Sequence, residues 1–163
     1  LKPENVLIDS NLTVRVCDLG LARSVTDEPP FTSYHATRWY RAPELLLQAD
    51  RYSTAVDMWA FGCIVAELHT GRPLFPGTSE LNQIVTICSI KGTFKAETWP
   101  FGAELVRKMR VQLPHHEPKN WSSVVPNVSS EAIQLIESSL RWDPEKRVTA
   151  SEALVYPYFD VFE

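Results

Sequence analysis

The sequence lacks several features that would point to a membrane or to a nucleic acid. No apolar run in its 163 residues approaches the ~18 residues that a membrane-spanning helix needs, and no basic stretch followed by an apolar one opens the chain. Lys and Arg number 16 against 20 Asp and Glu, which gives a net charge of −4. No basic block is therefore available to displace counterions from a phosphate backbone. These shortages predict no membrane span and exclude a general nucleic-acid binder.

Cysteine is also scarce, and its three copies are Cys17, Cys63 and Cys88. They are odd in number, widely spaced and set in apolar surroundings, which favours reduced thiols over a disulfide framework or a metal cluster. Hydrophobic residues make up 44% of the chain, which is enough for one buried core. A length of 163 residues is too short to expect two domains. We therefore expect one globular domain of a cytoplasmic and/or nuclear protein.

The patterning predicts a mainly α fold with a small β-hairpin. Residues 6–8 and 13–17 are short β-branched runs separated by a polar turn, as is typical of two hairpin strands. Residues 53–70 begin with a Ser-Thr start signal and end at Gly71, so they predict a helix. Because this helix is apolar on nearly every face, we expect it to run through the middle of a helical core.

Further helices are predicted in the second half of the chain. Ser79 is suited to cap a helix over residues 80–90. Residues 95–128 are rich in Pro, Trp and His, and they predict a looped insert with a short helical piece at 102–109.

The last two predicted helices follow this insert. The segment SSEAIQLIESSLRW places four apolar residues on one helical stripe: Ala132, Ile133, Ile136 and Leu140. Thr149 and Glu152 then form a capping box that opens a short last helix, which we expect Pro157 to stop.

Polar residues at one end of the predicted hairpin suggest a ligand site. Asn5 lies just before the first strand and Asp18 just after the second, so a tight hairpin brings an amide oxygen and a carboxylate together. Such oxygen ligands suit Mg²⁺, and Lys2 is a nearby positive charge suited to neutralising a transferring phosphoryl group. Asn and Asp-x-Gly are also common turn formers, so the residues by themselves leave both interpretations open.

Five motifs occur in the order of the protein-kinase catalytic domain: LKPENVL, DLG, APE at Ala42–Glu44, DMWAFG and WDPEKR. The chain therefore resembles the larger, C-terminal lobe of a eukaryotic protein kinase, lacking the N-terminal lobe. The resemblance covers essentially all 163 residues. It implies a partial kinase domain over 1–163, with an activation segment at 18–44 and an insert at about 92–128.

The resemblance implies a role for each residue near the hairpin. Asn5 and Asp18 are the residues expected to hold the two Mg²⁺ ions that bridge the phosphates of ATP, and Lys2 is expected to contact the transferred γ-phosphate. Leu7 is expected to form the apolar floor under the adenine. Cys17 is expected to line the back of the nucleotide site, as a buried and inert thiol.

Four more residues gain roles from the same resemblance. Glu44 and Arg147 are expected to form a buried ion pair that anchors the substrate-binding loop. Asp57 is expected to hydrogen-bond the backbone of the catalytic loop, which is a structural role. Thr37 is expected to lie against Lys2 and to shape the site of the nucleophile.

The loop before APE contains a T-x-Y triplet, Thr32–Tyr34, followed by ATRWYRAPE. Both features resemble the CMGC group, which contains the mitogen-activated and cyclin-dependent kinases. The resemblance implies activation by an upstream kinase at Thr32 and Tyr34, and a preference for Ser or Thr followed by Pro. Arg38 and Arg41 are expected to receive the phosphate on Tyr34. The alternative is that Thr32 and Tyr34 are simply exposed polar side chains.

The phosphate on Thr32 is expected to meet Arg23, the surviving part of a second basic pocket. The sequence of the insert resembles that of the RCK branch, which includes the male-germ-cell-associated and intestinal-cell kinases. Members of that branch regulate cilia and flagella, so a ciliary or flagellar location is implied.

In kinases His-Arg-Asp precedes the LKPEN motif, and that Asp accepts the proton of the substrate hydroxyl. We therefore expect the chain to be part of a longer protein and to transfer no phosphate by itself. We also expect a large exposed apolar patch around the helix at 53–70 in the isolated chain. A kinase-like binding module without catalysis and a scaffold that uses the insert and the helix at 80–90 are the other functions considered.

Overall fold

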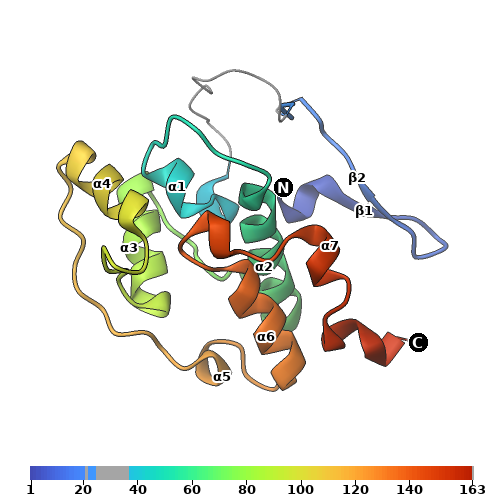
Figure 1. Ribbon diagram of the computed structural model, residues 1–163. Helices are drawn as coiled ribbons and strands as arrows, with labels where there is room; N and C mark the ends of the chain where they lie inside the picture. Colours follow the sequence, from blue (N-terminus) through green and yellow to red (C-terminus); the bar gives the residue numbers. More distant parts are fainter. Residues whose placement is uncertain (21, 25–36, 163) are drawn as a thin grey trace.

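The computed structural model describes residues 1–20, 22–24 and 37–162. It is mostly helical, with a two-stranded antiparallel sheet that projects beside the helices (Figure 1), so the predicted mainly α fold with a small hairpin is confirmed. The strands and α-helices in chain order are β1 (Val6–Ile8), β2 (Val14–Val16), α1 (Pro43–Leu46), α2 (Ala55–Thr70), α3 (Glu80–Lys91), α4 (Pro100–Met109), α5 (Trp121–Val124), α6 (Ser130–Ser139) and α7 (Ala150–Ala153). Short 3₁₀ helices lie between them or follow them: η1 (Pro3–Asn5), η2 (Arg38–Tyr40), η3 (Pro144–Lys146) and η4 (Pro157–Phe162).

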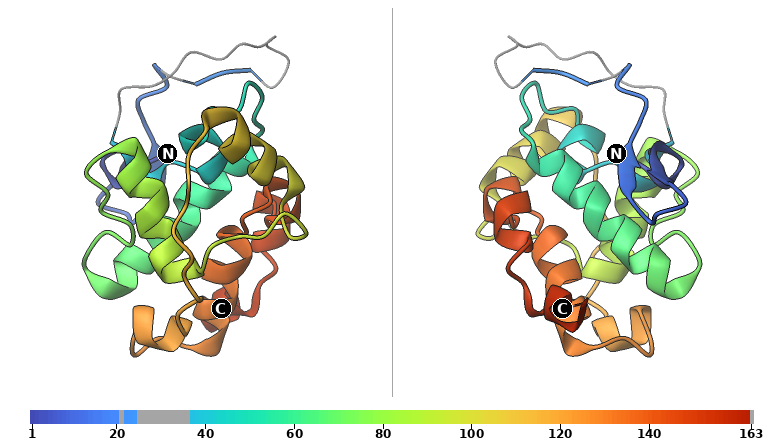
Figure 2. Two further views of the ribbon diagram at one scale, coloured as in Figure 1. Left: turned by 90° about the vertical axis from the view of Figure 1, so that its left-hand side faces the viewer. Right: turned by 90° about the vertical axis from the view of Figure 1, so that its right-hand side faces the viewer.

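Helix α2 runs through the middle of the helical part and packs against α6 (Figures 1 and 2). Its side chains Trp59, Cys63 and Ala66 are at most 1% exposed. The helix ends where Gly71 adopts a left-handed conformation with φ of 68°, which glycine reaches without steric cost. The expected central helix is confirmed.

The apolar patch expected around α2 is not where the sequence placed it. Within α2, which the structure describes in full, Leu68 is the large apolar side chain that is exposed. The other apolar side chains of α2 are buried or half-buried. The exposed apolar side chains concentrate on the hairpin instead, where Leu7, Ile8, Val14 and Val16 are 52–65% exposed.

Helix α3 begins as predicted, because the Ser79 Oγ accepts a hydrogen bond of 3.1 Å from the Asn82 N–H. Helix α1, in contrast, was not predicted as a helix, and it begins inside the expected activation segment at 18–44. Pro43 stands in its first turn, where the missing N–H of proline costs no hydrogen bond. The helix buries Leu46 and packs against α3.

The insert contains more helix than predicted. Helix α4 begins at Pro100, two residues before the expected start, and α5 was not predicted at all. Just before α4, the buried ring of Trp99 packs edge-on against Phe94, with 4.8 Å between ring centroids, and stacks on Trp142 at 6.1 Å. These rings fix the insert to the core.

The predicted stripe of α6 is wrong at one position. Ala132, Ile136 and Leu140 are fully buried, as expected, but Ile133 is only half-buried and Leu135 is fully buried in its place. The buried face is therefore rotated toward Leu135, which packs with residues of α7 and its neighbours.

The capping box at Thr149 and Glu152 is present, because the Thr149 Oγ1 accepts the Glu152 N–H and the Glu152 carboxylate accepts the Thr149 N–H. Pro157 does not stop this helix as expected. Helix α7 already ends at Ala153, and Pro157 is the first residue of η4.

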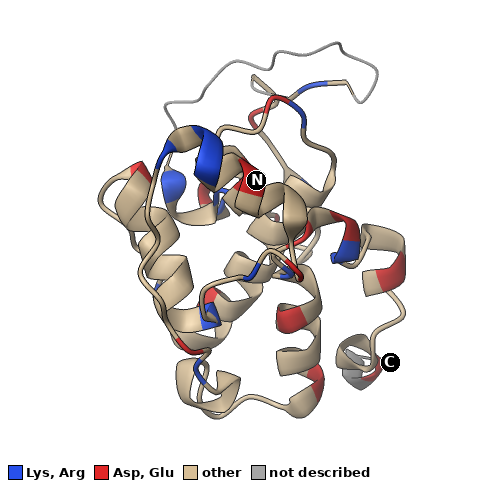
Figure 3. Cartoon of the chain, turned by 60° about the vertical axis from the view of Figure 1, so that its left-hand side comes forward, with Lys and Arg blue, Asp and Glu red and all other residues tan. Residues whose placement is uncertain are grey.

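Charged residues of both signs are mixed over the described chain (Figure 3). Among the described residues, no helix is both long and apolar enough to cross a membrane.

Candidate functional site

The hairpin brings Asn5 and Asp18 to the same end. The strands pair Val6 with Val16 and Ile8 with Val14. Next to the Val6–Val16 pair, the Cys17 N–H donates to the Asn5 carbonyl at 2.9 Å. Asn5 therefore lies opposite Cys17, one position before Asp18. At the other end, the Asp9 carboxylate accepts the N–H groups of the tight turn, which fixes this register.

Asp18 has an uncommon backbone conformation, with φ of 57°. Left-handed backbone is unfavourable for most side chains but is tolerated by Asp, which bonds its own backbone. Here the Asp18 Oδ1 accepts the Gly20 N–H at 3.4 Å. The residue is exposed, so its carboxylate remains accessible to a ligand.

Lys2 is joined to the same site by a short turn. The Asn5 N–H donates to the Lys2 carbonyl at 3.0 Å, and Pro3 stiffens the 3₁₀ helix η1 between them. One short turn therefore joins the backbone of Lys2 to that of Asn5.

The donor set at this end of the hairpin fits Mg²⁺ better than a transition metal. It offers an amide oxygen from Asn5 and a carboxylate from Asp18, and Mg²⁺ is typically held by one or two protein oxygens together with water and substrate phosphate. Among the described residues, no group of three or more His, Cys, Asp or Glu could hold a metal ion by itself. Asn5 and Asp18 could thus hold Mg²⁺ together with a phosphate ligand.

Leu7 and Cys17 are the expected nucleotide contacts. Leu7 lies on β1, and Cys17 directly follows β2. Leu7 is exposed and pairs with Arg15. Cys17 is only half-buried, so the expected buried thiol is wrong for this residue. Burial raises the pKa of Cys88 to about 11 and also raises that of Cys63, so both remain protonated thiols at neutral pH.

A cavity of about 520 Å³ lies beside the η1 turn, and Thr37 is one of its lining residues. Its lining comes from three segments: Glu4; Thr37, Arg38 and Trp39; and Pro76, Gly77 and Thr78. Because Glu4 lies between Lys2 and Asn5 in the chain, the cavity adjoins the end of the hairpin. We call Lys2, Asn5 and Asp18 the hairpin site. We call the cavity the peptide cavity below, after the ligand that is proposed for it.

Two of the expected phosphate-binding arginines lie on or next to η2. The Arg38 Nη1 donates to the Thr78 carbonyl at 3.4 Å, while its buried Nε has no partner among the described residues. The Arg41 Nη1 donates to the Glu80 carboxylate at 2.7 Å. Arg23 is exposed.

Thr32 and Tyr34, the expected phosphorylation sites, lie outside the described residues. Near them in the chain, the Tyr40 hydroxyl donates to the Glu67 carboxylate at 2.7 Å. Burial, together with this carboxylate, raises the pKa of Tyr40 above its usual range.

Glu44 and Arg147 form a buried two-pronged ion pair. Nη1 and Nη2 of Arg147 each donate to one carboxylate oxygen of Glu44 at 2.6 Å. The remaining N–H groups of the guanidinium donate to the carbonyls of Arg141, Ala55 and Trp142. All five donors are used, which offsets the cost of burying the charges. The pair joins α1 to the start of α2 and to the turn before η3.

Asp57 lies in the first turn of α2, and its Oδ1 is 3.2 Å from the nitrogen of Leu1. This contact joins the central helix to the segment that carries Lys2 and Asn5. The Asp57 carboxylate is 64% exposed, and contacts between exposed charges contribute little to stability.

Gln83 was not singled out from the sequence, although it is fully buried next to the peptide cavity. Its Oε1 accepts the Gly77 N–H at 2.9 Å, and its Nε2 donates to the Trp39 carbonyl at 3.4 Å. A signal was present: Gln83 lies on the same buried stripe of α3 as Ile84, Ile87 and Cys88. A polar residue in such a stripe needs partners.

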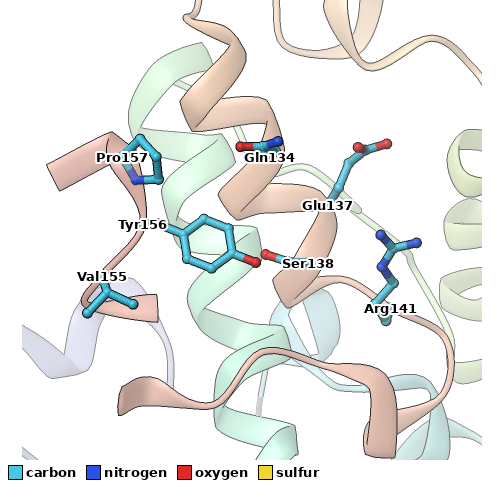
Figure 4. A pocket seen from close by; sticks show the side chains of 7 residues that line it. All are labelled: Gln134, Glu137, Ser138, Arg141, Val155, Tyr156 and Pro157. Carbon is cyan, nitrogen blue, oxygen red and sulfur yellow. The ribbon is translucent and has the colours of Figure 1, made fainter. Parts of the chain in front are cut away.

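A second cavity of about 410 Å³ lies between α6 and the segment before η4. Figure 4 shows the residues that line this cavity, and among them the Tyr156 ring extends toward α6. They are Gln134, Glu137, Ser138, Arg141, Val155, Tyr156 and Pro157. It shares no residue with the hairpin site or the peptide cavity.

The protein kinase domain family matches residues 1–159 of the chain. Serine/threonine-protein kinase ICK of Mus musculus and serine/threonine-protein kinase MAK of Rattus norvegicus are each 52% identical to it over 161 residues. Cyclin-dependent kinase F-3 of Oryza sativa subsp. japonica is 48% identical over 161 residues. The chain belongs to the protein kinase family.

These alignments cover 99% of this chain, but only 26% of the two rodent kinases and 37% of the rice kinase. The chain therefore spans about a quarter of the length of the rodent relatives. The resemblance to the RCK branch of the CMGC group, which rested on motifs, is confirmed by the similarity to the ICK and MAK kinases. Protein kinases as a family use ATP and Mg²⁺.

Proposed function

We propose that the full-length protein transfers the γ-phosphate of ATP to Ser or Thr residues of protein substrates, and that this chain supplies its metal, phosphate and peptide contacts. The observation that carries the proposal is the end of the hairpin. There the Asn5–Cys17 hydrogen bond aligns the positions of Asn5 and Asp18, and the η1 turn adds Lys2. A turn alone would explain Asn5 and Asp18, but it would not need the positive charge of Lys2 beside them.

In this proposal each residue acts by holding or neutralising charge. Asn5 and Asp18 hold Mg²⁺, which when bound offsets the negative charge of the phosphates. Lys2 places a positive charge next to the phosphoryl group that moves, where charge spreads over its oxygens. The half-buried position of Lys2 strengthens this interaction, because partial exclusion of water lowers the screening of charges.

The peptide cavity would take the substrate segment that follows the target residue. Its wall contains the partly exposed Trp39 ring and Pro76, which offer an apolar surface to a proline. A proline carries no N–H that would remain unsatisfied there. The preference for Ser or Thr followed by Pro is therefore compatible with the lining of this cavity.

The test is transfer of radiolabelled phosphate from ATP to a Ser-Pro peptide by the full-length protein, with and without the substitution Asp18→Asn. This substitution keeps the size of the side chain and removes the charged ligand. We expect kcat to fall at least a hundredfold with an unchanged melting temperature. Asp50→Asn is the matched control, because it removes an exposed carboxylate that pairs only with Lys108 among its described contacts. Equal activity of wild type and Asp18→Asn would refute the proposal.

A kinase-like scaffold is the alternative, and inactivity of the wild-type protein together with tight binding of a partner would favour it. Further proposals rest on the resemblance alone. They are activation by an upstream kinase at Thr32 and Tyr34, with phosphate contacts from Arg23, Arg38 and Arg41, and a role at a cilium or flagellum.

A further inference from the structure

Apart from Glu4, the lining of the peptide cavity forms two walls that come from distant parts of the chain. One wall is the segment Thr37–Trp39 and the other is the turn Pro76–Thr78. The distance between them is not fixed by covalent neighbours, so something in the tertiary structure must hold it. Any selectivity of the cavity for one side chain over another depends on this distance.

Three hydrogen bonds through Gln83 and Trp39 tie the two walls together. Gln83 accepts from the Gly77 N–H at 2.9 Å and donates to the Trp39 carbonyl at 3.4 Å. The Trp39 Nε1 in turn donates to the Gly77 carbonyl at 3.1 Å. Gln83 does not line the cavity itself, so it acts on the walls from behind.

The amide of Gln83 can make these bonds in one orientation only. The Gly77 N–H can only donate and the Trp39 carbonyl can only accept. If the amide were rotated by half a turn, its NH₂ group would face the Gly77 N–H, and its oxygen would face the Trp39 carbonyl oxygen. The side chain is 0% exposed, and water cannot replace either partner. Each bond that is lost leaves a buried polar group unsatisfied.

Gly77 shows how closely the turn rests on α3. A Cβ atom at this position would lie 2.5 Å from the Gln83 Cα and closer still to its Oε1. The turn therefore has no room to move toward the helix, and the two hydrogen bonds of Gln83 keep it and the Trp39 segment from moving away.

We propose that Gln83 is a positioning residue that sets the width of the peptide cavity, and through it the selectivity for proline directly after the target Ser or Thr. The inference rests on the proposed function. It adds a residue outside the substrate site that controls which peptides the site accepts.

The experiment compares two peptides that differ only in Pro or Ala after the target Ser, with the full-length protein as the enzyme. Gln83→Met keeps the length of the side chain and removes both hydrogen bonds. We expect KM for the Pro peptide to rise about tenfold, with kcat and the KM for the Ala peptide nearly unchanged. The selectivity for Pro then falls about tenfold.

Gln83→Glu provides a conservative variant with a graded response. Its carboxyl group accepts from the Gly77 N–H in either state, but it can donate to the Trp39 carbonyl only when protonated. The site is fully buried, and burial raises the pKa of a carboxyl group toward and above neutrality. We therefore expect the selectivity of this variant for Pro to be higher at pH 6 than at pH 8.5, whereas that of wild type is constant. This measurement remains decisive if the Met variant does not fold, and a flat profile would overturn the proposal.

Ile87→Val is the control for stability, because it removes a buried methylene group from the same helix without touching either wall. It should lower the melting temperature and leave selectivity unchanged. Equal losses for both peptides in the Gln83 variants would show a merely structural role and overturn the inference. If wild type phosphorylates neither peptide, the proposed function itself fails, and that failure is visible before any variant is made.

Discussion

Arg147 and Glu44 lie 103 positions apart in the chain and meet in a buried, bidentate ion pair with both N···O distances at 2.6 Å. The Arg147 guanidinium also lies over the Trp59 ring, 5.1 Å from its centroid. The pair therefore connects helix α1, which follows the Thr37–Trp39 wall of the peptide cavity in the chain, to the centre of the core. A contact of such long range can hold the candidate site in place only when the whole domain is folded.

Removing one partner of this pair should be costly. For Arg147→Met we expect a loss of about 3–5 kcal/mol in the free energy of unfolding, because the Glu44 carboxylate would be left buried and unpaired. The measurement is urea unfolding of the kinase domain in the full-length protein. The double variant Glu44→Met with Arg147→Met should lose less than the sum of the two single losses.

Lys108→Met is the matched control for this experiment. It breaks the pair with Asp50, in which both side chains are more than half exposed, and should cost less than about 1 kcal/mol. Similar losses for Arg147→Met and Lys108→Met would contradict the importance of the buried pair.

Lys91 should make stability depend on pH. Burial, aided by the Arg141 charge and opposed by Glu137, lowers its pKa to about 8, while its ammonium lies 5.6 and 5.9 Å from the Trp121 and Trp142 ring centroids. On rising pH the folded state releases this proton before the unfolded state does. Stability should therefore increase with pH between about 8 and the ordinary lysine pKa of 10.5.

The check is urea unfolding at several pH values from 7.5 to 10. The raised pKa values of Cys63, Cys88 and Tyr40 make stability fall with rising pH above about pH 9. The contribution of Lys91 is therefore the difference between the pH dependence of wild type and that of Lys91→Met. Lys95→Met, at an exposed lysine, should keep the wild-type slope. An identical pH dependence of wild type and Lys91→Met would contradict this prediction.

Gly102 and Gly71 should respond differently to substitution. A Cβ at Gly102 would lie 2.1 Å from the Trp99 ring, so Gly102→Ala should destabilise the domain by about 1–3 kcal/mol despite the better helix propensity of Ala. Gly71 has open space around it but a φ of 68°. There Asn should be tolerated better than Ala, since Asn adopts left-handed backbone more readily.

The two sites are compared by thermal unfolding of Ala and Asn variants at each. At Gly102 the larger Asn should be worse than Ala, which reverses the order expected at Gly71. The same order at both positions would show that the steric account of Gly102 is wrong.

Removal of divalent metal should stop phosphate transfer without unfolding the protein. Asn5 and Asp18 lie at the accessible end of the hairpin, and the described residues hold no cluster that could bind a metal for structural purposes. With excess chelator we therefore expect loss of transfer at an unchanged circular dichroism spectrum and melting temperature. Added Mg²⁺ should restore activity. A drop in melting temperature on chelation would instead indicate a structural metal.

Much of the local structure could be predicted because its causes lie within a few residues. The Ser79 cap, the Thr149–Glu152 box and the end of α2 at Gly71 each depend on hydrogen bonds or backbone angles inside one turn. The alignment of Asn5 and Asp18 was equally accessible, since a tight hairpin fixes its own register. The motif order was sufficient for the family.

The sequence failed where distant contacts decide. Local periodicity could not show that α6 buries Leu135 and leaves Ile133 half-buried, since the elements packed against the helix select its buried face. It could not show that Cys17 is only half-buried. It also could not show that α7 ends at Ala153.

By itself, therefore, the sequence determined the helices α2, α3 and α6, the hairpin, the kinase motifs and the candidate metal ligands, because each is encoded in a short stretch of chain. Only the tertiary structure decided that Glu80 pairs with Arg41 and that Gln83 joins the two walls of the peptide cavity. The physical reason is burial: a polar side chain removed from water must find partners, and which partners are within reach depends on how the whole chain packs.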